Sequence, residues 1–325
     1  MLWPLVYYLF GIFGFILLYE YYQRNIAKQK ALLDFLRSLD TFPQGPLAIS
    51  NKKPFEKIKQ EIASYFYFQR LHVIFGVDFS ASNEWQGLKT FNGQSLHTTQ
   101  PKNINPYQKA ISQLGLIFEE IFPCKIKYSS FGFGDENTKD YSFFPVVASG
   151  EEFDSHQKIL DAYLKQTEHV NLSGPTEYTP IIQKLISQGT LSPRDFTMLV
   201  IITDELKVSS ENKTLVKSLR TLANLPNVCL LVIGVGDGPW GKLSYEEHHI
   251  REEVFARIDK KKMPKESAQS KIFYDNFHFV SHNNFLVKQD KLDTENYFGR
   301  AVLRKLPTQL KQAYRHDEHR TKPQD

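Results

Sequence analysis

The stretch LHVIFGVDFSAS, residues 71–82, decides the fold because it joins an apolar strand to a row of oxygen-bearing side chains. Apolar residues fill almost all of 71–77, as in a strand that is buried on both faces of a sheet. Asp78, Ser80 and Ser82 follow at every second position, and in an extended chain such side chains point the same way. A simple turn would use Gly, Pro or Asn more freely. The pattern therefore predicts a ligand site directly after a buried strand.

Apolar runs recur along the chain and alternate with segments of helical periodicity. The strands predicted from these runs are 71–80, 125–134, 141–147, 196–204, 228–236 and 277–280. The predicted helices are 55–68, 106–121, 153–170, 179–188, 213–225 and 297–314. Strands that are apolar on both faces are typical of a parallel sheet covered by helices on each side. The predicted fold class is therefore α/β, with a doubly wound, Rossmann-like and mostly parallel sheet.

Ligands of such sheets gather at the carboxyl ends of the strands, where three segments place oxygen donors. Asp78, Ser80 and Ser82 end the first core strand, Asp204 ends the run 196–204, and the segment SGPTEYTP opens a helix at Thr176. Two carboxylates and three hydroxyls, without histidine or thiolate, disfavour zinc, copper and iron. Such a set suits Mg²⁺ or Mn²⁺, with Ca²⁺ as a looser alternative.

Neutral hydroxyl ligands would leave such an ion with much of its positive charge. An acidic side chain of a partner protein could then complete the coordination shell. The sequence therefore predicts a docking point for an external carboxylate.

Composition excludes some other classes of protein. The formal net charge is only +4, and no dense stripe of Lys and Arg interleaved with aromatic residues is present, so binding to nucleic acid is not expected. Cys124 and Cys229 are too few for a disulfide framework or a zinc site, and both are expected to be small core residues. This weakly favours a reducing compartment.

The N-terminal run 2–19 contains no charged residue and is just long enough to cross a bilayer as a helix. Aromatic residues at both of its ends resemble interfacial belts. A retained anchor is favoured over a cleaved signal peptide, because no Lys or Arg precedes the run and no small-residue cleavage pattern follows it. Arg24, Lys28 and Lys30 follow the run, so the positive-inside rule predicts that the large C-terminal part lies on the cytosolic side.

The order of these motifs resembles the von Willebrand factor A (vWA) domain with its metal-ion-dependent adhesion site, and within that group the copines. The resemblance rests on the D-x-S-x-S pattern from Asp78, then Thr176, then Asp204. The segments VDFSASN, NPYQKAI, FGFG, LSGPTEYTPII, VIITDE and VIGVG resemble copine segments in the copine order. The chain is thus expected to contain a transmembrane anchor (1–23), a helical linker region (24–63), a copine-like vWA domain (64–314) and a polar, loose tail (315–325).

The resemblance implies a metal site in which Ser80, Ser82 and Thr176 bind the ion, while Asp78 and Asp204 act directly or through water. It also implies metal-assisted protein docking without chemistry, so the chain is not expected to be an enzyme. The paired calcium-dependent lipid-binding domains of copines are not expected here. The RING finger of a related plant branch is not expected either, since the chain has two cysteines.

One position departs from the family pattern, because Glu205 follows Asp204 where the familiar TDG has glycine. Glycine reaches backbone angles that would strain a glutamate. Alternatively, Glu205 adds negative charge near the ion, which would tighten metal binding and weaken attraction for an acidic partner.

Two other functions are open at this point. The chain could be a structural accessory subunit of a larger membrane complex, with an incidental or empty metal site. It could also be a metal-dependent hydrolase, which needs a base or nucleophile near the ion, and only Glu205 offers one. The glycines of FGFGD and GVGDG fit neither phosphate-loop pattern and are expected in tight turns.

Overall fold

The fold was analysed in a computed structural model, which describes residues 52–100, 103–147, 150–206, 212–238, 240, 274–282 and 298–321. The predicted anchor at 2–19 lies outside these residues. None of the helices within them is both long and apolar enough to cross a membrane. The sheet and its helices belong to one compact unit, formed by Ile49–Thr99 with Asn105–Asp325. That unit includes the helix α2 (Lys52–Tyr65), most of which lies within the region 24–63 that was expected to be a linker.

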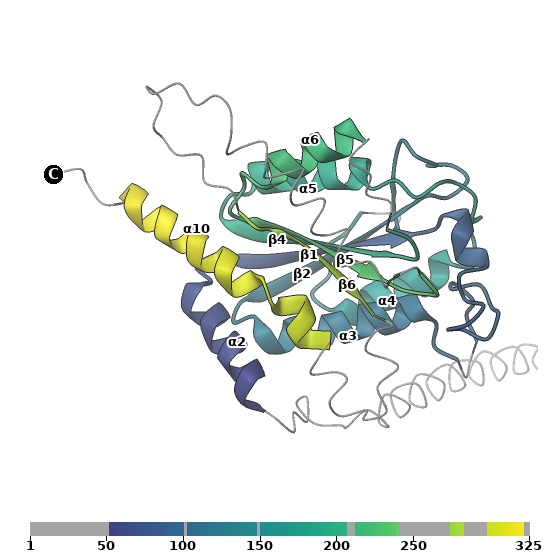
Figure 1. The fold of residues 1–325 in the computed structure, drawn as a ribbon, viewed down its shortest axis with the longest axis horizontal. Helices are drawn as coiled ribbons and strands as arrows, with labels where there is room; N and C mark the ends of the chain where they lie inside the picture. Colours follow the sequence, from purple (N-terminus) through teal and green to yellow (C-terminus); the bar gives the residue numbers. More distant parts are fainter. Residues whose placement is uncertain are drawn as a thin grey trace, which may run out of the picture. The chain divides into compact units, whose positions relative to one another are not determined.

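One six-stranded sheet forms the centre of this unit, with the strand order β3-β2-β1-β4-β5-β6 (Figure 1). The strands are β1 (Arg70–Asp78), β2 (Lys125–Phe133), β3 (Phe144–Pro145), β4 (Asp195–Thr203), β5 (Val228–Gly234) and β6 (Phe277–Ser281). Every pairing is parallel except that of β2 with β3. This is the order of a doubly wound sheet, in which the connections reverse direction between β1 and β4.

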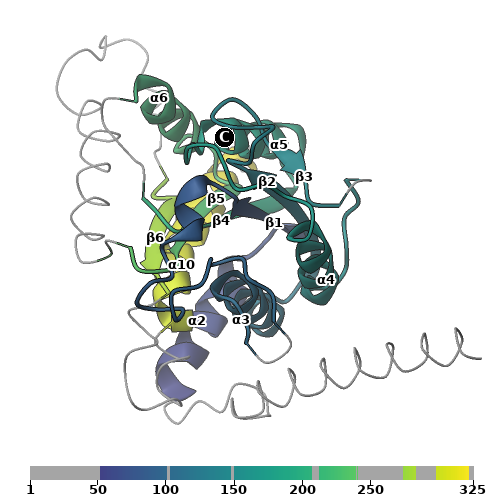
Figure 2. The same cartoon turned by 90° about the vertical axis from the view of Figure 1, so that its right-hand side faces the viewer.

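Helices cover both faces of the sheet (Figures 1 and 2). One face carries α5 (Thr179–Leu191) and α6 (Lys213–Leu222), which pack against each other. The other carries α3 (Pro106–Ile121), α4 (His156–Gln166), α10 (Leu306–Thr321) and α2 (Lys52–Tyr65). The predicted α/β class with a mostly parallel sheet is therefore confirmed.

The strands between these layers are buried on both faces, as their apolar sequences indicate. Every residue of β4 is buried, and so is every residue of β1 after Arg70. Side chains of β1, β4 and β5 form one core cluster with side chains of α5 and α6; these include Ile74, Leu199, Ile201, Leu230, Ile181, Leu185, Leu215 and Leu219. Because the central strands are buried on both faces, their register is fixed. The loops that follow these strands therefore begin from fixed positions.

Several elements differ from their predicted extents; α4, for example, is shorter than the predicted helix 153–170, and two further differences involve proline. The strand predicted at 141–147 is reduced to the two residues of β3 at the sheet edge, where Pro145 lacks the N–H that a longer ladder would need. The helix predicted at 297–314 is a short helical stretch at 298–303 followed by α10. Pro307 lies in the first turn of α10, where proline is tolerated, and the helix continues to Thr321 instead of ending at Tyr314.

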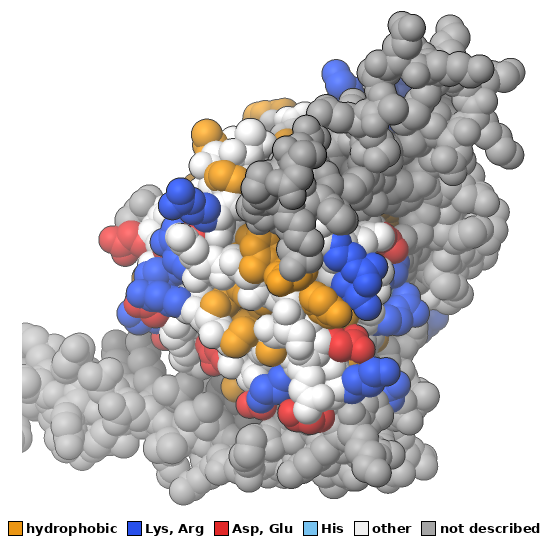
Figure 3. Space-filling model, turned by 90° about the vertical axis from the view of Figure 1, so that its left-hand side faces the viewer, with side chains coloured by type: hydrophobic (Ala, Val, Ile, Leu, Met, Phe, Trp, Pro, Cys, Tyr) orange, Lys and Arg blue, Asp and Glu red, His pale blue; other side chains and the backbone are white. Residues whose placement is uncertain are grey.

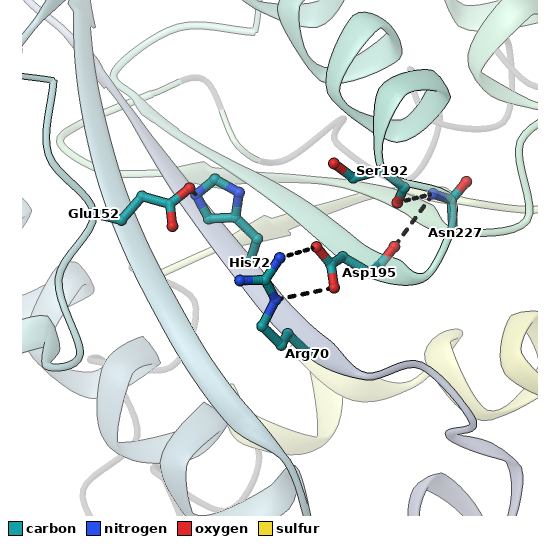
Figure 4. Close-up of polar contacts among 6 residues, drawn as sticks. All are labelled: Arg70, His72, Glu152, Ser192, Asp195 and Asn227. Carbon is teal, nitrogen blue, oxygen red and sulfur yellow. Dashed lines mark hydrogen bonds and ion pairs between the residues drawn. The ribbon is translucent and has the colours of Figure 1, made fainter.

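The face at the amino ends of the parallel strands carries apolar side chains among Lys and Arg (Figure 3). On this edge the Arg70 guanidinium contacts the Asp195 carboxylate through two hydrogen bonds of 3.1 and 2.6 Å (Figure 4). These two residues are register partners at the start of β1 and β4, so the ion pair ties the two central strands. His72 lies two residues after Arg70 in β1, and its Nε2 is 3.6 Å from the Glu152 Oε1.

Asn227 joins three backbone segments at the same edge of the sheet. Its buried Nδ2 donates to the backbone carbonyls of Gly189, Ser192 and Asp195 at 2.9, 3.3 and 3.2 Å. We expect Asn227→Ala to lower the free energy of unfolding by about 2–3 kcal/mol, because buried carbonyls lose their donor.

Urea denaturation of the intact chain measures this change. Asn224→Ala is the matched control, since the exposed Asn224 donates to one carbonyl only, that of Arg220. The control should change the unfolding free energy by less than about 0.5 kcal/mol. Equal losses in the two variants would contradict the structural role of Asn227.

Candidate metal centre

Asp78 is the last residue of β1. This strand pairs with β4 at the point where the connections of the sheet change direction, and the Asp78 side chain is fully buried. Its Oδ1 accepts from the Ser80 backbone N–H at 2.9 Å, and its Oδ2 accepts from the Thr203 hydroxyl at 2.5 Å. Thr203 is the last residue of the neighbouring strand β4. The carboxylate therefore bridges the ends of the two strands at which ligands bind in doubly wound sheets.

The three predicted hydroxyls lie together in front of Asp78. The Thr176 Oγ1 donates to the Ser80 Oγ at 3.0 Å, and the Ser80 and Ser82 hydroxyls are 3.2 Å apart. Ser80 and Thr176 are buried, while Ser82 is half-buried. Residues 96 positions apart in the sequence thus contribute oxygens to one cluster.

Asp204 follows β4 directly and is fully buried, yet neither of its carboxylate oxygens has a hydrogen-bond partner among the described residues. The Ser82 hydroxyl lies near enough to lower its pKa somewhat, but the pair does not have the geometry of a hydrogen bond. Buried carboxylates are normally paired or hydrogen-bonded, because an isolated buried charge is very costly. Asp204 is therefore the group in this cluster that most needs a cation.

The pKa values of both carboxyl groups also indicate that ionisation is unfavourable here without a cation. Burial raises the pKa of Asp78 to about 6, although hydrogen bonds from Thr203 and Ser80 oppose the shift. Burial, and then the negative charge of Asp78, raise the pKa of Asp204 to about 8. Glu205 adds a smaller upward contribution to each. Two neighbouring acids that resist ionisation would both be stabilised as carboxylates by a divalent ion.

These residues fit a magnesium or manganese ion. The set supplies hard oxygen donors, and the Asp204 carboxylate has no hydrogen-bond partner in the described part of the chain. In the described part of the chain, no group of three or more His, Cys, Asp or Glu side chains is placed to hold a metal. A metal in this cluster would consequently depend on the neutral hydroxyls for part of its coordination.

Glycines and backbone bonds hold the surrounding loops in place. Gly134, after β2, has a φ of +78°, and a Cβ there would lie 3.1 Å from the Ser80 nitrogen and 3.3 Å from the Asp78 Oδ1. Gly174 donates to the Gly134 carbonyl (2.8 Å) and accepts from Ala81 (3.2 Å). The loops that carry Ser80 and Thr176 are thus joined to each other and to the loop after β2. Gly134, the second glycine of FGFG, lies at a bend with positive φ, as predicted, whereas Gly132 lies within β2.

A buried aromatic cluster packs behind the Asp78 loop, and His97 binds the Asp78 backbone. The His97 Nε2 lies 2.8 Å from the Asp78 carbonyl oxygen, to which it donates, and its Nδ1 lies 2.9 Å from the Tyr163 hydroxyl. The His97 ring stacks between Phe79 and Tyr107, with ring centroids 4.6 and 4.1 Å away. Burial lowers the pKa of His97 to about 3, so the ring is neutral and acts as a fixed hydrogen-bonding group.

Asn83 links the same aromatic cluster to the serines. Its Nδ2 donates to the Ser80 carbonyl at 3.1 Å, and its Oδ1 accepts from the Tyr107 hydroxyl at 2.6 Å. Asn83 is fully buried, so its amide is committed to this support.

The Asp204 loop is held by Tyr178, whose hydroxyl donates to the backbone carbonyl of Glu205. The Thr203 Oγ1, which donates to Asp78, lies 2.9 Å from the same carbonyl oxygen. Glu205 is not among the residues with positive φ, so the expected backbone strain at this position is wrong. Its contribution is instead the negative charge that raises both neighbouring pKa values.

A comparison with family models gives a match to Copine over residues 95–322 of the 325. The chain belongs to the copine family. Copine family protein 1 of Caenorhabditis elegans is 32% identical over 273 residues, which cover 84% of this chain and 22% of that protein. The E3 ubiquitin-protein ligase RGLG3 of Arabidopsis thaliana is 29% identical over 256 residues, covering 74% of this chain and 62% of the relative. The chain therefore spans only part of the length of these relatives.

Among solved structures, similarities are found to a von Willebrand factor type A protein from Catenulispora acidiphila and to the manganese-loaded TRAP protein of Plasmodium vivax. The first is 10% identical with a TM-score of 0.39, covering 74% of this chain and 43% of that structure. The second is 15% identical with a TM-score of 0.36, covering 66% and 70%.

The copine chain thus places all five predicted donors in one region at the carboxyl ends of its strands. Sequence reasoning did not find the residues that support them, namely Asn83, His97, Tyr107, Thr203 and Tyr178. Asn83 and Tyr178 lie inside the quoted copine-like segments VDFSASN and LSGPTEYTPII, so the motif alone could have marked them. His97 carries no sequence signal, because only the fold brings it to the Asp78 carbonyl.

The isolated Asp204 carboxylate predicts that the effect of Asp204→Asn reverses with the metal. In EDTA at pH 8, we expect the variant to be more stable than the native chain by about 1–3 kcal/mol, because a buried repulsion is removed. With millimolar Mg²⁺ the native chain should be the more stable of the two, since only it gains from binding.

Thermal and urea unfolding of the intact chain, with and without Mg²⁺, measure this reversal. Glu136→Gln is a control, because Glu136 is an exposed carboxylate bonded to Asn171. The same order of stabilities in both conditions would contradict a cation site at Asp204.

The neutral His97 predicts a dependence of stability on pH. Its folded pKa of about 3 lies below the value of 6.5 for a free imidazole, so the unfolded chain takes up this proton first. Its contribution is complete above pH 6.5 and decreases as the pH falls toward 3. Between pH 7 and 5 the native chain should lose about 2 kcal/mol more than His97→Gln, which keeps a donor.

Urea unfolding at several pH values, with EDTA present throughout, tests this difference. Proton NMR titration of the native His97 ring gives an independent readout that needs no variant. A ring that becomes protonated near pH 6.5 in the folded chain would contradict the buried, neutral arrangement.

Proposed function

We propose that the chain is a membrane-anchored module that docks a partner protein through a divalent metal ion. The observation that carries the proposal is the unpaired, buried Asp204 carboxylate beside Asp78 and three hydroxyls. Ser80, Ser82 and Thr176 would bind the ion, with Asp78 and Asp204 acting directly or through water. When bound, the ion supplies a positive centre that attracts an acidic side chain of the partner.

The arrangement of carboxylates supports docking more than hydrolysis. Glu177 follows Thr176 in the sequence, but its Oε1 accepts from the Thr179 N–H (2.8 Å) at the start of α5, and its Oε2 accepts from Asn212 (3.0 Å). Glu177 is therefore engaged in helix capping. Glu205 is the remaining carboxylate next to the centre in sequence, and a hydrolase would have to use it as the base.

Glu205 also favours a second candidate function. Its charge raises the pKa of both Asp78 and Asp204, which indicates that it acts electrostatically on the centre. A negative charge there would bind the ion more tightly and leave it less attractive to an acidic partner. The chain would then be a structural accessory subunit of a larger membrane complex, and its metal would be incidental to partner binding.

The membrane anchor is proposed from sequence alone. The uncharged run 2–19 would span the bilayer, and Arg24, Lys28 and Lys30 after it would place the large domain on the cytosolic side. Several relatives are named E3 ubiquitin-protein ligases, and the chain spans about half to three fifths of two of them. We propose no ligase activity for this chain, since docking requires only the domain that it shares with them.

Capture of partners from native membranes tests the docking function. The intact chain is cross-linked in membranes containing Mg²⁺, and the attached proteins are identified by mass spectrometry. We expect specific partners to be lost with EDTA and with Asp78→Ala, because either change removes the positive centre. Binding to the membrane itself should persist in both cases.

Two further results separate the alternatives. Partners that remain attached in EDTA and in Asp78→Ala would contradict docking through the metal and support the accessory-subunit function. Mg²⁺-dependent cleavage of a phosphoester substrate that Asp204→Ala abolishes would instead show a hydrolase. The exposed-carboxylate variant Glu136→Gln should retain every partner of the native chain.

A further inference from the structure

We propose that Trp85 and Leu88 form an apolar platform beside the metal centre, which receives a large apolar side chain of the partner. The inference rests on the proposed docking function and specifies its ligand. The partner would present an Asp or Glu to the metal, with an aromatic or large aliphatic residue within about three positions of it. The acidic side chain gives attraction to the ion, and the apolar neighbour gives contact area.

The platform lies directly beside the donors. Ser82 is in the 3-10 helix η1 (Ala81–Glu84), and its carbonyl accepts from the Trp85 N–H at 3.1 Å. Leu88 donates its N–H to the Trp85 carbonyl at 3.3 Å. Only two residues, Asn83 and Glu84, therefore separate the donor Ser82 from Trp85. An extended peptide covers about 3.3 Å per residue, so a ligand could reach both features with two or three residues.

Both platform side chains are strongly exposed although they are large and apolar. Trp85 is 54% exposed and Leu88 is 67% exposed. Single exposed apolar residues are normal on protein surfaces, but two within four positions, next to a predicted binding centre, are more informative. Tryptophan is also the residue type that most often contributes a large share of binding energy in interfaces.

Hydrogen bonds to Asp237 fix the segment that carries the platform. The Asp237 carboxylate accepts from the backbone N–H groups of Lys89 and Thr90 at 2.9 Å each, and also from the Thr90 hydroxyl. The Asp237 N–H in turn donates to the Gln86 carbonyl at 2.6 Å. The loop after β5 therefore fixes both ends of the segment that carries Leu88. A preorganised apolar surface loses little entropy when it binds.

Gly236 lets the two loops approach this closely. Its φ is +77°, and a Cβ at this position would lie 2.8 Å from the Gln86 carbonyl oxygen and 2.6 Å from Leu96. The contact between the loops thus depends on a residue without a side chain. The positioning of the platform is a property of the fold at the carboxyl edge, where the donors also lie.

The proposed ion beside the platform favours an acidic ligand over a purely apolar one. Among the nearby side chains, the exposed Lys89 is offset by the exposed Glu84 and by the Asp237 carboxylate, so the ion would be the positive charge that selects such a ligand. Leu191 is even more exposed, at 77%, but it ends α5 at the opposite edge of the sheet. The platform combines exposed apolar area with a proposed cation, and this combination identifies the class of ligand.

Selection from a displayed peptide library tests the inference. The probe is a library of random octapeptides with one fixed Asp at the fourth position, selected on the intact chain in nanodiscs. Selections run in Mg²⁺ and in EDTA, with the native chain, Trp85→Ser, Leu88→Ser and the control Leu191→Ser. We expect Mg²⁺-dependent enrichment of Trp, Phe, Leu or Ile within three positions of the Asp.

Affinities of the selected peptides provide the second readout. Trp85→Ser should weaken binding about tenfold and remove the apolar preference, as expected for a central aromatic contact. Leu88→Ser should act in the same direction, and Leu191→Ser should have no effect. Stabilisation by Mg²⁺ should be equal in all four chains, because none of these residues is a proposed ligand.

The remaining outcomes separate this inference from the function on which it rests. Mg²⁺-dependent selection of peptides without an apolar preference would overturn the platform and leave metal-dependent docking intact. Apolar enrichment that persists in EDTA would also overturn it, since the platform would then bind without the ion. An absence of any Mg²⁺-dependent selection would overturn both. Loss of Mg²⁺ stabilisation in Trp85→Ser would show that Trp85 supports the metal centre instead.

Discussion

The structure depends on the placement of two buried carboxylates at the point where the sheet reverses direction. Asp78 and Asp204 lie at the ends of neighbouring parallel strands, burial raises the pKa of both, and the charge of Asp78 raises the pKa of Asp204 further. Asp78 is satisfied by Thr203 and by the Ser80 backbone, whereas Asp204 has no hydrogen-bond partner among the described residues. Without a cation, burial therefore leaves Asp204 largely protonated at neutral pH, and a bound cation would stabilise its carboxylate form.

The remaining polar groups at this edge act by fixing geometry. The His97 imidazole is neutral because it is buried, and it positions the Asp78 carbonyl without adding charge. Asn83 and Tyr107 extend the same network to the Ser80 backbone. On the other side, Tyr178 holds the carbonyl of Glu205. The hydroxyls are thus presented by loops that are already ordered, which lowers the entropy lost on binding.

Much of this was predictable from the sequence, for identifiable reasons. Strands β1, β4 and β5 are apolar on both faces, so their class and approximate limits followed from composition. The five donors were recognised because D-x-S-x-S, Thr176 and Asp204 lie at strand ends in a fixed order. The support by His97, the backbone contact of Gly174 with Gly134, and the ordinary φ at Glu205 were not predictable. Each depends on distances between loops that pattern and propensity do not encode. The edge strand was overestimated because an apolar run does not show how far Pro145 permits pairing.

The pairing of β1 with β4 also sets the order in which the chain can fold. Arg70 and Asp195 contact each other across 125 positions, and β1 is buried between β2 and β4. During synthesis, β1 can pair with β2 once residue 133 has emerged, but its other edge stays uncovered until β4 follows some 60 residues later. The apolar strand that carries Asp78 therefore keeps one unpaired edge during this interval, and the proposed metal centre can form only after Thr203 and Asp204 have left the exit tunnel.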